Sequence, residues 1–240
     1  MIYADNAATT KLDKEAFEAM KPYLLNEYGN ASQPYSFGRV SKKALRQARE
    51  VVASCINAMP EEIYFTSGGT ESDNWAIKGV ALAQKGAAPI ITSEIEHHAI
   101  LRSCEAMEQL GFPVLHVSVN TLGEIELGDI KEKLEVHPRI VSIMFANNEI
   151  GTIQPIEELS TMIHDAGALF HTDAVQAVGH IPVNVQKLRI DLLSASAHKF
   201  NGPKGIGFLY IRNGTPIIPY VNGGSQEFSI RAGTENVAAI

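Results

Sequence analysis

The chain has 240 residues, 45% of them hydrophobic and 20% charged, which is typical of a soluble globular protein. A formal net charge of -7 argues against nucleic-acid binding. No apolar run approaches the length of a membrane span, and the N-terminus lacks the basic and apolar regions of a signal peptide, so we expect a cytoplasmic protein. The two cysteines, Cys55 and Cys104, fall in separate helix-like segments, where we expect small buried hydrophobic side chains in a reducing compartment.

The first sixty residues predict two helices, at about 13–28 and 40–58, joined by a polar loop at 29–38. From residue 60 onward apolar runs alternate with helical periodicity, which predicts an α/β fold with a mostly parallel, doubly wound sheet. A short Gly/Pro turn precedes the last run, so that strand should join the sheet antiparallel. The segment 235–240 resembles the start of a helix. The expected strands are 62–66, 89–92, 114–118, 140–145, 169–172, 191–195 and 207–211, and the expected helices between them include 70–85, 98–110 and 155–166.

Lys199 ends the run Asp191-Leu-Leu-Ser-Ala-Ser-Ala-His-Lys199, and a glycine-rich turn follows it. Partial burial would lower the pKa of this amine and make it a nucleophile able to form a Schiff base. Proteins hold pyridoxal 5'-phosphate (PLP) through such a lysine. A PLP site would also require a phosphate cradle, a carboxylate for the pyridine nitrogen and a group that stacks on the ring.

A phosphate cradle is indicated by Thr66-Ser-Gly-Gly-Thr-Glu-Ser72, which follows a strand and opens a helix. Gly69 and its neighbouring glycine permit close backbone approach, the new helix presents N–H groups, and Thr70 can add a hydroxyl. Ser196 and His198, at alternate positions just before Lys199, could also bind a phosphate. The alternatives are an ordinary turn with Thr70 as the N-cap and an ordinary polar strand end.

A carboxylate for the pyridine nitrogen is offered by Asp173, which comes just past an apolar strand, where ligands of open α/β sheets bind. Gln176 could donate to the phenolic oxygen of the cofactor. The alternatives are an N-cap role for Asp173 and a helix-surface position for Gln176. His171 lies within the strand, and we expect a hydrogen-bonded core histidine.

Two further turns offer the remaining polar groups. In Ser93-Glu-Ile-Glu-His-His98 the preferred stacking residue is His98, with His97 expected at the helix start or in solvent. In Ala146-Asn-Asn-Glu-Ile-Gly151 the residue expected to reach a ligand is Asn148, with its neighbours capping the loop.

Metal binding is a less well supported interpretation of the same residues. Adjacent residues such as those at 96–98 rarely point at one zinc ion. His171, Asp173 and His198 formally match an iron-binding triad of two histidines and one carboxylate. That triad leaves Lys199, Thr70 and His98 without a role, so no metal is expected.

Together these motifs resemble the cysteine desulfurases of the NifS/IscS type, which are PLP enzymes of the class V aminotransferase group. Any single motif is weak, but the series runs in order along the whole chain. The matching segments are Tyr3–Thr10, Gly29–Ser32, Phe65–Asn74, Glu96–Ala99, Asn147–Gly151, His171–Gln176, Ser194–Lys199 and Arg231–Asn236.

The resemblance implies a fold type I PLP domain and a role for each matching residue. Lys199 would be the Schiff-base lysine and the acid/base, and His98 the stacking residue, which would also move protons. Asp173 would be the pyridinium partner, Gln176 the phenolate partner, and Asn148 a neighbour of the substrate carboxylate and ring oxygen. The residues implied in phosphate binding are Gly69, Thr70, Ser196 and His198, with Thr234 reaching the phosphate of the neighbouring subunit of a homodimer.

The same resemblance implies conversion of L-cysteine to L-alanine, with the sulfur passed to an enzyme cysteine as a persulfide. The sulfur would then go to an acceptor or scaffold protein, for iron–sulfur cluster or other sulfur biosynthesis. Residues 1–12 would lie on the small-domain side, and residues 13–240 would form the PLP-binding large domain. The family's nucleophilic cysteine and a carboxylate-binding arginine lie in a C-terminal small domain beyond position 240, so we expect this chain alone to be inactive. The alternatives are a selenocysteine lyase or other class V enzyme, and a non-catalytic PLP-binding fragment.

Overall fold

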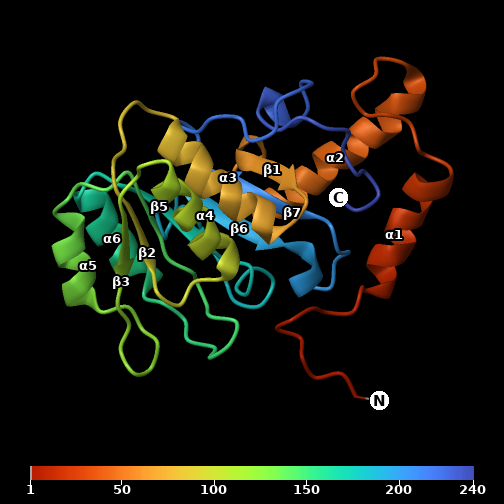
Figure 1. Cartoon of the computed structure of the whole chain (residues 1–240). Coiled ribbons are helices and arrows are strands. Elements are labelled where there is room, and N and C mark those ends of the chain that lie inside the picture. The colour runs from red at the N-terminus through yellow and green to blue at the C-terminus, as the bar shows by residue number, and fades with distance from the viewer. Residues whose placement is uncertain (1) are drawn as a thin grey trace.

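Seven strands form a single sheet in a computed structural model that describes residues 2–240 (Figure 1). The spatial order is β1-β7-β6-β5-β4-β2-β3. Neighbours from β6 to β3 run parallel, whereas β7 is antiparallel to both β6 and β1. The predicted fold class and the antiparallel last strand are thus confirmed. The strands are β1 (Ile63–Thr66), β2 (Ile90–Ser93), β3 (Val114–Val117), β4 (Ile140–Ser142), β5 (Leu169–Asp173), β6 (Leu192–Ser196) and β7 (Gly207–Ile211).

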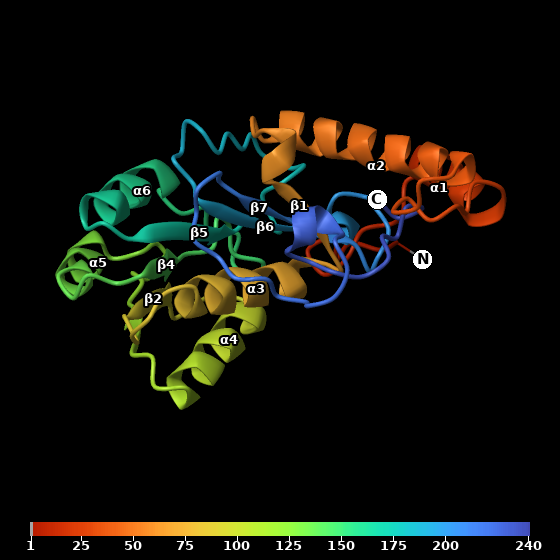
Figure 2. The same ribbon diagram turned by 90° about the horizontal axis from the view of Figure 1, so that it is seen from above.

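Helices cover both faces of the sheet (Figure 2). On one face lie α2 (Ser36–Cys55), α5 (Leu127–Leu134) and α6 (Ile156–Asp165), and on the other lie α3 (Gly69–Leu82) and α4 (His98–Gln109). Helix α1 (Lys14–Leu25) stands beside the sheet and buries none of its residues. Short 3-10 turns occur at η1 (Pro60–Glu62), η2 (Ala197–Lys199) and η3 (Glu227–Ser229). Among residues 2–240, every helix is too short or too polar to span a lipid bilayer.

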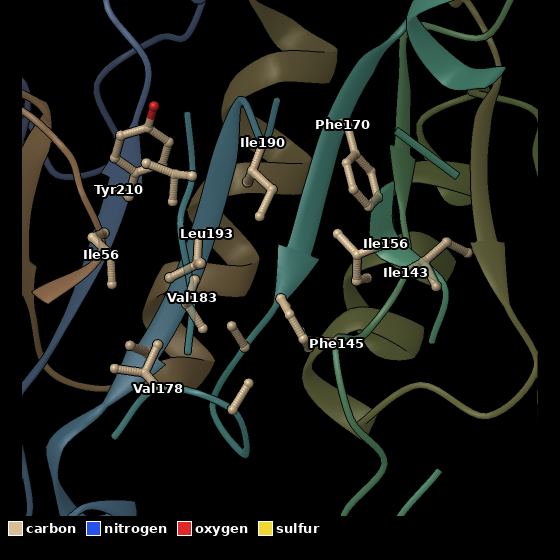
Figure 3. Close-up of a cluster of buried hydrophobic side chains, with 14 of the residues drawn as sticks. Ile56, Ile143, Phe145, Ile156, Phe170, Val178, Val183, Ile190, Leu193 and Tyr210 are labelled. Carbon is tan, nitrogen blue, oxygen red and sulfur yellow. The ribbon is translucent and has the colours of Figure 1, made fainter. Parts of the chain in front are cut away.

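Consecutive strand residues alternate between two separate hydrophobic clusters. Ile91, Val141 and Leu193 join the cluster under α2, α5 and α6, whereas their neighbours Ile90, Ile140 and Leu192 join the cluster under α3 and α4. Figure 3 shows part of the first cluster, with Phe170 and Leu193 among its members. Because both faces are covered, the strands are apolar on both sides and their polar residues collect at the ends.

Three local expectations need revision. Strand β4 ends at Ser142 rather than at 145, and Phe145 lies in the following turn, where its N–H donates to the carbonyl oxygen of Asp173 and its own carbonyl oxygen accepts from the N–H of Gln154. Helix α5 was not expected, and at eight residues it buries only Ile130 and Leu134, too few for a clear periodic signal. The segment 235–240 makes a turn at 237–239 instead of a regular helix.

Candidate cofactor site

A cavity of about 490 Å3 opens at the carboxyl ends of β4, β5 and β6, next to the N-terminus of α3. This is the end of an open α/β sheet at which ligands bind. The N-terminal segment contributes Asp5, Ala7 and Ala8 to its wall. The other lining residues come from the last residues of β5 and β6, from turns that follow β2, β4, β5 and β6, and from the N-terminal part of α3. The structure therefore gathers groups that are up to about 190 positions apart in the chain.

Lys199 lies in η2, directly after β6, and its amine faces the cavity. Nζ donates to the carbonyl oxygens of Ala7 and Ala8, the latter at 3.0 Å. Burial lowers the pKa of Lys199, while the nearby carboxylates of Asp173 and Asp5 oppose that effect. A lowered pKa leaves more of the amine unprotonated and nucleophilic at neutral pH than an exposed lysine would have.

Asp173 is the last residue of β5 and is buried at the inner wall of the cavity. Its Oδ1 accepts from the N–H of Val175 at 2.9 Å, although the following residues form turns rather than an α-helix. Burial raises the pKa of Asp173, and the Val175 N–H and the charges of His97 and Lys199 oppose that rise. Those three contacts all favour the ionised carboxylate over the acid.

Gln176 lines the cavity beside Lys199, and its Nε2 donates to the carbonyl oxygen of Ala7 at 2.9 Å. The same carbonyl accepts from Lys199. Two predicted site residues thus hold one backbone segment across the cavity. The residue types at Ala7 and Ala8 gave no signal of this role, because the contact is made by their backbone oxygens.

The structure places His97, and not the expected His98, at the cavity. His97 is the N-cap of α4 and accepts the Ala99 N–H at Nδ1, at 3.1 Å, which orients its ring. His98 is the first residue of α4, is exposed, and is absent from the cavity wall. The preference for His98 as the stacking residue is therefore corrected: the turn that starts α4 directs the two neighbouring side chains differently, which the sequence alone does not show.

A second cavity of about 390 Å3 adjoins the first, and the two share Gly69, Thr70, Ser196 and His198 among their lining residues. The N-cap of α3 is Gly68 with φ of 141°, so Thr70 is not the N-cap, and no side chain caps the helix. The first N–H groups of α3 are therefore free to bind an anion.

The backbone around this cradle approaches its neighbours closely. A Cβ built on Gly69 would lie 2.7 Å from Cγ2 of Val175, so only glycine fits without displacement. Lys204 also lines the second cavity, although it was not expected there. Burial lowers the pKa of His198, and the charges of Lys199 and Lys204 lower it further. The cradle thus combines a helix N-terminus, two hydroxyls and a lysine, which suits a phosphate group.

Asn148 lines the main cavity, and its Nδ2 donates to Oε1 of Glu149 at 2.7 Å. Asn147 caps the loop as expected, since its Oδ1 accepts the N–H groups of Glu149 and Ile150. Thr234 is exposed and does not line the cavity of its own chain. Its contact with a neighbouring subunit stays a prediction.

The iron-binding alternative does not fit the geometry. His171 is fully buried and bonded by the hydroxyls of Ser142 at 2.8 Å and Ser194 at 3.0 Å, as expected of a core histidine. Across residues 2–240, the group of potential metal-ligating side chains that comes together is Asp73, His97 and Asp173, with ligand atoms within 4.8 Å of one another. Asp73 was not predicted as a site residue, because a single polar residue within a helical segment gives no local signal that its side chain is buried.

Neither cysteine lines the cavity. Cys104 is buried as expected, and burial raises the pKa of its thiol to about 12. Cys55 is exposed near the end of α2, contrary to the expectation of burial. A thiol with a pKa near 12 is almost entirely protonated at neutral pH and is a poor nucleophile.

The chain matches the class-V aminotransferase family over residues 2–240. It therefore belongs to that family, as the fold and the lysine-centred cavity indicate. It is 56% identical to the cysteine desulfurase IscS of Dictyoglomus turgidum and 52% identical to that of Methanosarcina thermophila, in each case over 100% of this chain. The chain spans about 60% of the length of these curated relatives (61% and 59%).

Two solved structures agree with this assignment. A structure described as a NifS-like protein has a TM-score of 0.97 and 42% identity, covering 99% of this chain and 66% of that protein. A second, described as SspA in complex with cysteine, has a TM-score of 0.97 and 37% identity, covering 100% of this chain and 70% of that protein.

Proposed function

We propose that this chain binds PLP in the cavity around Lys199 and forms the cofactor-binding part of a cysteine desulfurase. The observation that carries the proposal is the arrangement of three unlike groups in adjoining cavities. The Lys199 amine and the Asp173 carboxylate line one cavity, and the anion cradle at the N-terminus of α3 is shared between that cavity and the adjoining one. PLP has a basic ring nitrogen, an aldehyde and a phosphate, and each of these groups has a matching partner among the three.

Each residue would then contribute a defined interaction. Asp173 would accept the N–H of the pyridine ring, and Gln176 would donate to the phenolic oxygen. His97 would cover one face of the ring, a role we transfer from His98 because of its place in the cavity. The phosphate would bind at Gly69, Thr70, Ser196 and His198, and Asn148 would lie near the substrate carboxylate.

Bound PLP acts as an electron sink that labilises the α-proton of an amino acid. Lys199 would hold the aldehyde carbon covalently, and its Nζ would be the acid/base group that takes the α-proton of the amino-acid substrate. Because Cys55 and Cys104 lie away from the cavity, we infer that neither is the thiol that accepts sulfur.

The same proposal includes a homodimer in the cytoplasm, in which Thr234 reaches the phosphate of the neighbouring subunit. Exposure of Thr234 supports this, because a residue at a subunit interface is accessible in the isolated chain. The cysteine named in the description of one structural relative supports L-cysteine as substrate over a selenocysteine or another amino acid.

Incubation of the purified chain with PLP tests the proposal directly. We expect a visible absorption band of protein-bound PLP and a change in that band on addition of L-cysteine but not of D-cysteine. Gel filtration with light scattering tests the dimer, with Thr234→Ala as the interface variant. A chain that binds PLP no more tightly than serum albumin does would overturn the proposal. Equal spectral responses to L-cysteine and to L-alanine would overturn the substrate assignment.

A further inference from the structure

A buried polar layer lies between α3 and the sheet, directly beneath the cavity. Ser142, His171 and Ser194 occupy neighbouring strands on the face that α3 covers, in registers where Ser142 pairs with His171. Asp73 descends from α3 onto this layer and is 1% exposed. Its Oδ1 has no hydrogen-bond partner among residues 2–240. A buried oxygen without a partner is costly and points to a role beyond packing.

Among residues 2–240, no lysine or arginine pairs with Asp73. Its Oδ1 lies 3.8 Å from Nε2 of His171, which looks like an ion pair. Burial, however, lowers the pKa of His171 to about 3, so the imidazole is neutral. Both ring nitrogens of His171 are already engaged by Ser142 and Ser194. The contact with His171 therefore supplies no compensating charge.

Asp173 lies close to Asp73, with side-chain oxygens within 4.8 Å of each other and of His97. Two buried carboxylates at this separation repel strongly, so such a pair holds one proton. The two sites are not equivalent. Asp173 accepts the Val175 N–H and lies near the charge of Lys199, whereas Asp73 faces Asp173 and the neutral His171, and the Ser194 hydroxyl opposes the rise in the pKa of Asp73 only in part.

We infer that Asp73 is a positioning residue that keeps the single proton of this pair, so that Asp173 is the one carboxylate the cavity presents to a bound cofactor. The protonated carboxyl group of Asp73 can then donate a hydrogen bond to Asp173, directly or through one water, in addition to the contact that Asp173 would make with the cofactor. The inference rests on the proposed function, because Asp173 is assigned to the ring nitrogen of PLP. Burial and the charge of Asp173 also raise the pKa of Asp73, in agreement with this assignment.

The location of the proton can be measured without any cofactor. Carbon-13 labelling of the aspartate carboxyl groups, with assignment by Asp73→Asn and Asp173→Asn, reports each protonation state by NMR. At pH 7 we expect one protonated carboxyl signal in the wild-type chain and its loss in Asp73→Asn. Two ionised carboxylates at pH 7 would overturn the inference, and so would a protonated signal that disappears only in Asp173→Asn.

PLP affinity gives the second readout, measured by equilibrium dialysis. Asp73→Asn keeps the shape, the neutral charge and an N–H donor, so we expect a Kd within about threefold of wild type. Asp73→Ala removes the donor to a charged partner, and we expect a Kd about tenfold higher. Ser103→Ala, a buried change on α4 whose hydroxyl bonds only its own helix at Ala99, is the matched control and should leave Kd unchanged.

The outcomes separate the two proposals. If the wild-type chain binds no PLP, the proposed function fails while the NMR result still decides where the proton resides. Equal Kd values for wild type and Asp73→Ala, with circular dichroism showing a folded protein, would overturn the positioning role. Zinc binding that competes with PLP and is lost in Asp73→Asn would also overturn it, because the three clustered side chains would then be metal ligands.

Discussion

Two buried carboxyl groups in this chain differ in how fully neighbouring groups bind their oxygen atoms. Glu227 lies at the corner between α2 and β1 and is 6% exposed. Its carboxylate accepts hydrogen bonds from two guanidinium nitrogens of Arg49, at 2.7 and 2.8 Å, and from the N–H of Phe65 at 2.8 Å. Asp73, beneath the cavity, is buried more completely and has an oxygen with no partner in the described chain. At the corner, neighbouring protein groups compensate the buried charge of Glu227. Beneath the cavity, the buried carboxyl group of Asp73 lacks such a partner, which leaves it available to a ligand site.

The corner network also holds an unusual backbone. Glu227, Phe228 and Ser229 all have positive φ, at 42°, 55° and 70°, which non-glycine residues adopt rarely. The Arg49 guanidinium lies 4.6 Å from the Phe65 ring centroid and 5.1 Å from that of Phe228. The ion pair and these stacking contacts offset a backbone cost of about 1–3 kcal/mol per residue. Removal of the pair should therefore release the whole turn.

The largest expected effect is on cofactor attachment. Lys199→Ala should abolish the borohydride-trapped PLP adduct at the site, because the amine that forms the covalent bond is gone. The free energy of unfolding should change by less than about 1 kcal/mol, since Lys199 is only half-buried. Peptide mapping by mass spectrometry measures the adduct. Lys187→Ala, at an exposed lysine that lines neither cavity, is the control, and an adduct that moves to Lys204 in Lys199→Ala with unchanged yield would contradict a unique role for Lys199.

Glu227→Gln should lower the free energy of unfolding by about 3–5 kcal/mol, because it leaves the Arg49 guanidinium buried and uncompensated. Urea denaturation measures the change. Asp73→Asn is the matched variant beneath the cavity and should lower stability by less than about 1 kcal/mol at pH 7, since a neutral acid is replaced by a neutral amide. Equal losses in the two variants would remove the distinction between the two regions.

A pH effect should follow from Glu96, a buried residue whose pKa burial raises to about 8. Between the unfolded pKa near 4.3 and the folded value of about 8, the native state holds a proton that the unfolded state has released. The free energy of unfolding therefore falls as pH rises through this window, by about 1.4 kcal/mol per pH unit for this group. Glu96→Gln should flatten that slope in urea titrations from pH 5 to 8. A steeper slope would contradict the assignment.

The smallest effect concerns the thiols and leaves the fold intact. A disulfide reagent should label Cys55 quickly in the native chain, because this residue is exposed, and Cys104 only after denaturation, because burial raises its thiol pKa to about 12. Cys55→Ser should abolish the fast phase. Rapid labelling of Cys104 in the native protein would show that α4 opens readily, which its burial does not suggest.

Most of the elements and much of the site could be predicted from patterns of residue types alone. Apolar runs with period two or 3.6 marked all seven strands and most helices, because that periodicity arises within each segment. Lys199, Asp173 and Gln176 were found because each follows a strand end, and parallel strands bring their carboxyl ends to one edge. The glycines before α3 were found because an unhindered helix N-terminus needs them.

Which side chains come into contact depends on how the elements pack. His97 rather than His98 faces the cavity because the turn into α4 sets the side-chain directions of adjacent residues. Asp73 became a cavity residue because α3 packs on the sheet with that side inward, and Ala7 because its backbone carbonyl, not its side chain, makes the contact. The Arg49–Glu227 pair joins residues 178 positions apart. Such contacts depend on how distant elements pack, and no local pattern of residue types encodes that.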